Sequence, residues 1–119
     1  MSDPLPLRTR IALFVRDRGA CVYCGATYQN GAQLTGDHVV SRKRGGSDKI
    51  ENLVTACRPC NEDKAHFSLA AYLFELRDRG QNTAGIAERV AAAQATPIDW
   101  VAVAAALAAW TQKPGEPEE

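Results

Sequence analysis

The four cysteines come in two pairs, and their spacing predicts a metal site. Cys21 and Cys24 form the motif CVYC, and Cys57 and Cys60 form the motif CRPC. Two such pairs typically supply four thiolates to one zinc ion, because each pair folds into a turn that offers both sulfurs. Two disulfides and a thioredoxin-like redox motif are the alternatives, but a redox motif uses a single pair. We expect structural zinc, since four sulfurs leave no open position for a substrate.

Residues with further chemistry lie between the cysteine pairs and directly after the second pair. Asp37 and His38 are adjacent, a Gly-Gly pair follows, Asn52 stands before Leu53, and Asn61 comes directly after the last cysteine. In this order, with cysteine pairs on both sides, the sequence resembles the HNH endonuclease family. The resemblance covers roughly residues 8–66.

The resemblance implies a fold and a role for each of these residues. The family folds as a ββα-metal finger, in which a hairpin and one helix hold a single divalent cation against the scissile phosphate. By that resemblance, Asp37 and Asn61 would bind the catalytic metal and His38 would be the general base. Asn52 would brace the loop between the strands and so hold His38 in orientation.

Elementary chemistry agrees with these roles. Phosphodiester hydrolysis needs a nucleophile that loses its proton near neutral pH, and histidine is the side chain whose ordinary pKa lies there. A carboxylate and an amide oxygen are hard ligands that suit Mg²⁺ or Mn²⁺. Because neighbouring strand residues point to opposite faces, we expect a kink or bulge to bring Asp37 and His38 to one site. His66 lies off the helix position that carries a histidine ligand in some family members, so we do not expect it to bind the metal.

Each residue also has a plain structural reading. His38 alone would be an ordinary, partly buried histidine, and Asn61 alone would be a helix cap. The basic run Arg42, Lys43 and Arg44 would normally be a solvated loop, but beside a phosphodiesterase site it favours contact with the DNA backbone. We also assign Lys64 to DNA contact.

The elements that position these residues can be read from periodicity and turn signals. The stretch 67–76 is apolar nearly all round, which predicts burial on several sides. Trp100, Leu107 and Trp110 form a stripe that we expect to pack against 67–76, with a dimer interface as the alternative. The predicted elements are helices over 6–18, 61–79 and 83–95, a last helix capped by Thr96, and strands over 33–41 and 52–56.

We therefore expect an α+β fold with a small ββα-metal core, stapled by a Cys₄ zinc and flanked by an N-terminal helix and a C-terminal helical extension. Residues 1–80 would form the nuclease domain. Residues 81–119 would form a helical extension packed on it, with an acidic tail from about residue 112. At 119 residues the chain has the size of one domain.

The distribution of charge, and the lack of membrane-span and secretory-signal patterns, limit the kinds of partner that we expect. Lys and Arg number 14, as do Asp and Glu, but the basic excess falls in residues 1–80 and the acidic excess in 81–119, so the first part suits phosphate. The sequence has no apolar run near the roughly 20 residues of a membrane span and no secretory signal, so we expect a cytoplasmic protein without a membrane partner.

The sequence thus predicts a metal-dependent HNH endonuclease that hydrolyses DNA phosphodiester bonds, with structural Zn²⁺ and catalytic Mg²⁺ or Mn²⁺. The resemblance to the family implies 5′-phosphate and 3′-hydroxyl ends. Two alternatives remain. The chain could be a zinc-finger module that binds DNA or protein without cleavage, or a nuclease subunit of a larger phage or defence complex. A homodimer is a further arrangement that the sequence leaves open.

Overall fold

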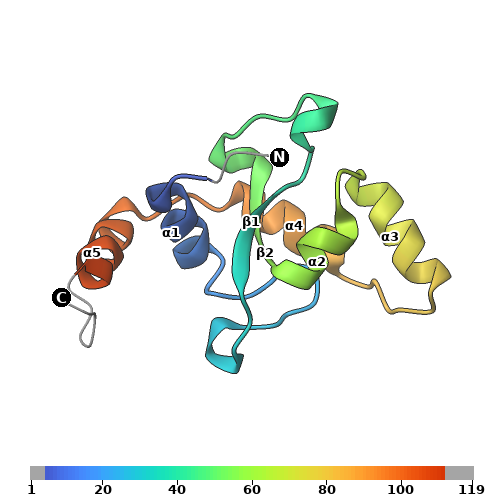
Figure 1. The fold of residues 1–119 in the computed structure, drawn as a ribbon, viewed down its shortest axis with the longest axis horizontal. Helices are drawn as coiled ribbons and strands as arrows, with labels where there is room; N and C mark the ends of the chain where they lie inside the picture. The colour runs from blue at the N-terminus through green and yellow to red at the C-terminus, as the bar shows by residue number, and fades with distance from the viewer. Residues whose placement is uncertain (1–4, 112–119) are drawn as a thin grey trace, which may run out of the picture.

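A computed structural model of the chain describes residues 5–111, and its elements confirm the α+β class (Figure 1). The predicted acidic tail, from about residue 112, lies outside the described residues. Three short 3-10 turns occur in the loops. The helices and strands of the described part are α1 (Leu7–Arg16), β1 (Leu34–His38), β2 (Leu53–Cys57), α2 (Arg58–Lys64), α3 (Leu69–Asp78), α4 (Ile86–Ala95) and α5 (Trp100–Thr111).

An antiparallel hairpin and the helix that follows it in the chain form the centre of the fold. Strand β1 pairs with β2 in a register that runs from Leu34 opposite Cys57 to His38 opposite Leu53. Helix α2 begins directly after β2, with Pro59 in its first turn, where a missing N–H costs nothing. Helix α1 lies on one side of the hairpin and helices α2 and α4 on the other (Figure 1). This is the predicted ββα arrangement.

Strand β2 is buried along its whole length because both of its faces are covered. Leu53 packs with Leu13 of α1 in one apolar cluster. On the other face, Val54 belongs to a larger cluster that also holds Tyr72 of α3 and Val90 of α4. Residues on both sides of position 80 therefore share one core.

A buried ion pair ties the end of α1 to β2. The Arg16 guanidinium, with no exposed side-chain surface, contacts the Asp17 carboxylate at 2.7 Å and donates to the carbonyl oxygen of Leu53 at 2.8 Å. Asp17 Oδ2 in turn accepts the backbone N–H of Thr55 at 2.9 Å. Because both charges are satisfied by each other and by strand atoms, the pair fixes where the helix meets the hairpin.

The predicted single helix over 61–79 is wrong, because the chain breaks after α2. Ala65 takes a positive φ of 52°, and Ser68 starts α3 by accepting the backbone N–H of Ala71 at 3.1 Å. The expected burial of 67–76 on several sides is also wrong: Phe67 is 46% exposed and Phe74 is 66% exposed. Only one face of α3 enters the core.

Helix α5 also differs from its prediction in start and in partner. It begins at Trp100, after Asp99 accepts the backbone N–H of Ala102 at 3.0 Å, so Asp99 takes the capping role expected of Thr96. Helix α5 packs against α1 (Figure 1) rather than against 67–76. The guanidinium of Arg8 lies over the Trp100 ring, 4.1 Å from its centroid.

No single helix among residues 5–111 is long and apolar enough to span a membrane. By length and composition alone, the pair formed by α4 and α5, which is bent by 93°, would pass the same test.

The ion pair between α1 and β2 gives a stability prediction. Asp17→Ala leaves the buried Arg16 guanidinium without its counter-charge and the Thr55 N–H without its acceptor. We expect the free energy of unfolding of the zinc-loaded protein to fall by about 3 kcal/mol, measured by urea denaturation. The control is Asp78→Ala, at an exposed position at the end of α3. Equal stability of the two variants would contradict a structural role for the pair.

Candidate functional site

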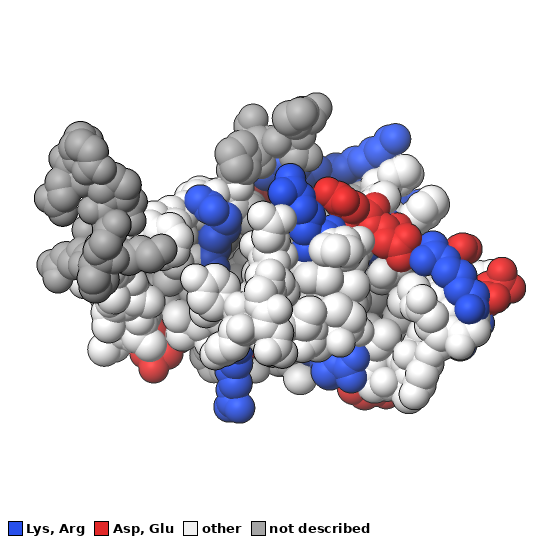
Figure 2. Space-filling model, turned by 60° about the horizontal axis from the view of Figure 1, so that its bottom comes forward, with Lys and Arg blue, Asp and Glu red and all other residues white. Residues whose placement is uncertain are grey.

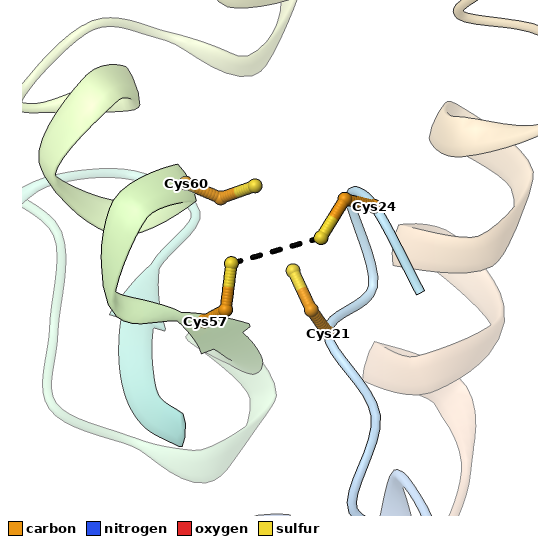
Figure 3. A group of neighbouring side chains, drawn as sticks. All are labelled: Cys21, Cys24, Cys57 and Cys60. Carbon is orange, nitrogen blue, oxygen red and sulfur yellow. Dashed lines mark hydrogen bonds between the residues drawn. The ribbon is translucent and has the colours of Figure 1, made fainter. Parts of the chain in front are cut away.

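The four cysteines meet at one point, although they come from distant parts of the chain. Their sulfur atoms all lie within 4.8 Å of one another, and the sulfurs of Cys24 and Cys57 are 3.6 Å apart. All four are free thiols in the structure rather than disulfides. Figure 3 shows one pair on the loop after α1 and the other at the junction of β2 and α2, with the side chains pointing inward.

The surroundings of the sulfurs fit a zinc ion. Gly25 closes the first turn with a φ of 80° and donates its N–H to the Cys21 carbonyl at 2.9 Å. The Tyr23 N–H points at the Cys21 sulfur at 3.4 Å. Burial, and then the charge of Cys21, raise the pKa of Cys60. Four neighbouring thiolates therefore need a cation to compensate their charge, which Zn²⁺ supplies.

A second candidate site is a cavity of about 650 Å³ along the edge of β1. Asp37, His38 and Asn61 all line it, so the structure brings together the predicted base and the two predicted metal ligands. Among the remaining predicted or considered residues, Arg42, Lys43 and His66 also line this cavity.

The expected kink or bulge at Asp37 and His38 is wrong. The two residues pair regularly with Val54 and Leu53, so their side chains leave opposite faces of the strand. Both still reach the cavity, because it runs along the edge of β1 that does not pair with β2 and is lined by consecutive residues from Thr35 to His38. No distortion of the strand is required.

Asp37 is a buried carboxylate with two partners on one oxygen. The Tyr23 hydroxyl donates to Oδ2 at 2.6 Å, and the Lys64 ammonium lies 3.4 Å from the same atom. Burial raises the pKa of Asp37, and the positive charge of Lys64 and the hydrogen bond from Tyr23 oppose that rise. Within the described residues Oδ1 has no hydrogen bond, so it is the oxygen that could bind a cation.

The predicted contact of Lys64 with DNA does not fit its position. Its side chain has no exposed surface, and the ammonium donates to the His38 carbonyl at 2.9 Å. Lys64 is buried because it neutralises the Asp37 carboxylate between β1 and α2. It therefore acts inside the fold rather than at a nucleic-acid surface.

His38 is held by a partner that the sequence did not reveal. Its Nε2 lies 2.7 Å from Asp48 Oδ1, and Arg42 also donates to Asp48, at 2.8 Å from Nε. Hydrogen bonds from Arg42 and His38 lower the pKa of Asp48 to about 2. The carboxylate is thus ionised at neutral pH and can only accept, so Nε2 carries a proton, and in the neutral imidazole the lone pair is then on Nδ1.

The loop that carries Asp48 is closed by Asn52. Its side-chain nitrogen donates to the carbonyl oxygens of Val40 and Ser47 at 2.9 and 2.8 Å, and its side-chain oxygen accepts the Val40 N–H at 3.0 Å. A side chain at Gly46 would collide with the Val40 carbonyl. These contacts fix the loop beside His38.

The basic residues of this loop differ in their exposure to solvent. Lys43 and Arg44 are exposed, and Arg42 is half-buried against Asp48. Arg44 donates to the His66 carbonyl at 3.0 Å, and the His66 ring stacks on Phe67. On the face in Figure 2, basic and acidic side chains are scattered among uncharged ones.

Comparison with known proteins gives a family match for part of the chain and a structural match. Residues 21–67 match the family model of HNH endonucleases. The matched range includes both cysteine pairs together with Asp37, His38, Asn52 and Asn61. No curated protein matches the chain.

A solved structure shares the fold of this chain. It is a type II-C Cas9 enzyme from Actinomyces naeslundii, with a TM-score of 0.50 and 24% sequence identity. The match covers 76% of this chain and 11% of the Cas9 chain, so the likeness concerns the fold of a small part of that enzyme.

Two residues of the candidate site were missed by sequence reasoning. Asp48 shows only as a charged residue in a glycine-containing loop, and its contact with His38 depends on how that loop folds back. Tyr23 shows only as the residue inside the first cysteine pair. The signal that could have found it is its place next to a metal ligand, where a hydroxyl can reach a neighbouring site.

The cysteine cluster gives a metal prediction. We expect about one zinc ion per chain in the purified protein and loss of both the zinc and most folded structure in Cys57→Ala. Elemental analysis and circular dichroism measure the two effects. The control is Asn30→Ala, in the exposed loop between the cysteine pairs. A Cys57→Ala protein that stays folded and zinc-loaded would refute the site.

Proposed function

We propose that this protein is a divalent-metal-dependent HNH endonuclease that hydrolyses DNA phosphodiester bonds, with His38 as general base. The observation that carries the proposal is the cavity shared by Asp37, His38 and Asn61, in which His38 is oriented by an ionised carboxylate. A module that only binds would have no use for a base held in this way.

The residues of the cavity fit a hard divalent cation. Asp37 offers Oδ1, and the side chain of Asn61 makes no hydrogen bond to any of residues 5–111, which leaves its amide oxygen for a ligand. Carboxylate and amide oxygens favour Mg²⁺ or Mn²⁺ over softer ions. When bound, such an ion neutralises charge that develops on the phosphate and the leaving oxygen. Asp37 and Asn61 would hold it.

His38 supplies the proton acceptor. Its Nε2–H donates to Asp48, so Nδ1 is the nitrogen that takes the proton from the attacking water. As His38 becomes positively charged, the Asp48 carboxylate at 2.7 Å stabilises that charge. Arg42 keeps Asp48 in place at 2.8 Å, and the Lys64 contact with the His38 carbonyl fixes the backbone.

The substrate would reach the cavity from the side of the basic loop. Lys43 and Arg44 are exposed, and Lys43 also lines the cavity, so these two residues suit contacts with the phosphates that flank the scissile bond. Such contacts carry no sequence information. We therefore propose binding with little sequence preference.

The decisive test is nicking of supercoiled plasmid by zinc-loaded protein with Mg²⁺, Mn²⁺ or EDTA. We expect metal-dependent nicking by the wild type and a loss of about 10²–10⁴-fold in His38→Ala, the range for removal of a general base. Zinc content and circular dichroism should stay unchanged in the variant.

His66→Ala is the matched comparison, because His38 and His66 are the two histidines of the chain. It should retain at least ten-fold more activity than His38→Ala, since a general base is worth far more than a cavity-lining ring. Nicking by His38→Ala at the wild-type rate would contradict the mechanism. A folded, zinc-loaded wild type that does not nick would point to a binding module instead.

Asp48 gives an independent prediction on the same mechanism. Asp48→Asn keeps the shape of the side chain but removes the charge that fixes the His38 tautomer. We expect kcat for nicking to fall about ten-fold, the worth of one charge-assisted hydrogen bond, with the DNA concentration at half-maximal rate little changed. The control is Glu51→Gln, which removes one exposed negative charge from the neighbouring turn. Equal effects of the two variants would contradict the orienting role.

A further inference from the structure

A buried hydrogen bond connects the cysteine cluster to the cavity. Tyr23 lies inside the first cysteine pair, and its hydroxyl donates to Asp37 Oδ2 at 2.6 Å. Both residues are nearly inaccessible, at 4% and 3% exposure. The proposed reaction does not use Tyr23, so the contact needs its own explanation.

The position of the Tyr23 hydroxyl is fixed from three directions. The ring packs edge-to-face on Tyr72 of α3, with centroids 5.6 Å apart. Arg89 of α4 donates to the carbonyl oxygen of Val22 at 3.0 Å and to that of Tyr23 at 3.4 Å. The Tyr23 N–H points at the Cys21 sulfur at 3.4 Å. Because the cysteine turn and two helices hold it, this hydroxyl can serve as a rigid reference for Asp37.

We infer that Tyr23 is a positioning residue that sets the orientation of the Asp37 carboxylate for a divalent metal. The inference rests on the proposed function, in which Asp37 is a ligand of the catalytic metal. Tyr23 holds Oδ2, so Oδ1 is turned to the cavity as the single free oxygen. Without the hydroxyl, Oδ2 keeps only Lys64 at 3.4 Å, and the carboxylate can rotate towards the ammonium.

The arrangement also makes the cavity depend on the zinc site. The cysteine turn that would grip zinc carries the hydroxyl that orients Asp37 on β1. Loss of the turn therefore removes a support of the metal ligand without changing any residue of the cavity. This is a different role from general stabilisation of the fold, because it acts on one oxygen atom of one ligand.

The test is Mn²⁺ binding to the zinc-loaded full-length protein, measured by calorimetry on the wild type, Tyr23→Phe and Tyr72→Phe. Tyr72→Phe is the matched control, since it removes a hydroxyl from the other ring of the same aromatic pair, and that hydroxyl interacts with Asp63 and Cys60 rather than with Asp37. We expect Tyr23→Phe to bind Mn²⁺ about ten-fold more weakly, the usual loss when a partner of a metal ligand is removed. Tyr72→Phe should bind within about two-fold of the wild type, and all three proteins should hold equal zinc.

In nicking assays the same change should raise the Mn²⁺ concentration needed for half-maximal rate about ten-fold, with kcat at saturating Mn²⁺ close to that of the wild type. A uniform loss of kcat at all Mn²⁺ concentrations would indicate damage to the fold and would overturn the positioning role.

The failures of the two proposals are distinguishable. If the wild type binds Mn²⁺ and Asp37→Asn does not, the metal centre stands. Equal Mn²⁺ affinity of Tyr23→Phe and the wild type would then overturn the role of Tyr23 alone. If the wild type does not bind Mn²⁺, the metal centre of the proposed function fails and the inference fails with it.

A measurement on the wild type keeps the test open if Tyr23→Phe does not fold. The chain has three tyrosines, so protein labelled with ¹³C at the tyrosine ζ-carbon gives three resolvable signals. Saturation with Mg²⁺ should shift the signal of Tyr23, because the ion binds the Asp37 carboxylate that accepts the Tyr23 hydrogen bond. The signal of exposed Tyr28 should stay in place. An unmoved Tyr23 signal in protein that binds Mg²⁺ would overturn the inference.

Discussion

The register between β1 and β2 is the constraint on which both candidate sites depend. It places His38 opposite Leu53 at one end of the hairpin and Leu34 opposite Cys57 at the other. The cysteine cluster and the reactive residues are therefore held at a fixed separation by backbone hydrogen bonds. A slip of one residue would turn Asp37 to the α1 face, away from Tyr23 and Lys64. Burial of both faces of β2 makes such a slip costly.

Two buried ion pairs stand where helices meet this hairpin. Arg16 and Asp17 join α1 to β2, and Lys64 and Asp37 join α2 to β1. Burying charges costs several kcal/mol each, so neither pair is an efficient source of stability. In both pairs, each charged group also makes a hydrogen bond to a backbone atom or a hydroxyl of another residue. Their effect is to select one docking geometry for each helix.

The parts of the site that follow from local sequence could be predicted, and the parts that depend on tertiary contacts could not. Cysteine spacing and the Asp37–His38 pair are local signals, and the family match covers both. The contacts of His38 with Asp48 and of Tyr23 with Asp37 join residues whose proximity depends on loop folding. The helix break at Ala65 was missed because alanine gives no signal for a positive φ. The docking of α5 on α1 was missed because an apolar stripe predicts that a helix face is buried but not which element covers it.

The buried ammonium of Lys64 has a consequence for the proposed reaction. In the protein alone it balances the Asp37 carboxylate, so the cavity is preformed without requiring a second cation. A divalent ion on Oδ1 would share that carboxylate with the ammonium, and mutual repulsion would weaken its binding. With a divalent ion bound, the charges of the ion and the Lys64 ammonium would exceed that of the Asp37 carboxylate. The cavity would then be positive, which favours a phosphodiester anion over a neutral ligand. In the proposed reaction, weak metal affinity and strong attraction for phosphate would thus both follow from one charge arrangement, and metal and nucleic acid would bind more tightly together than either does alone.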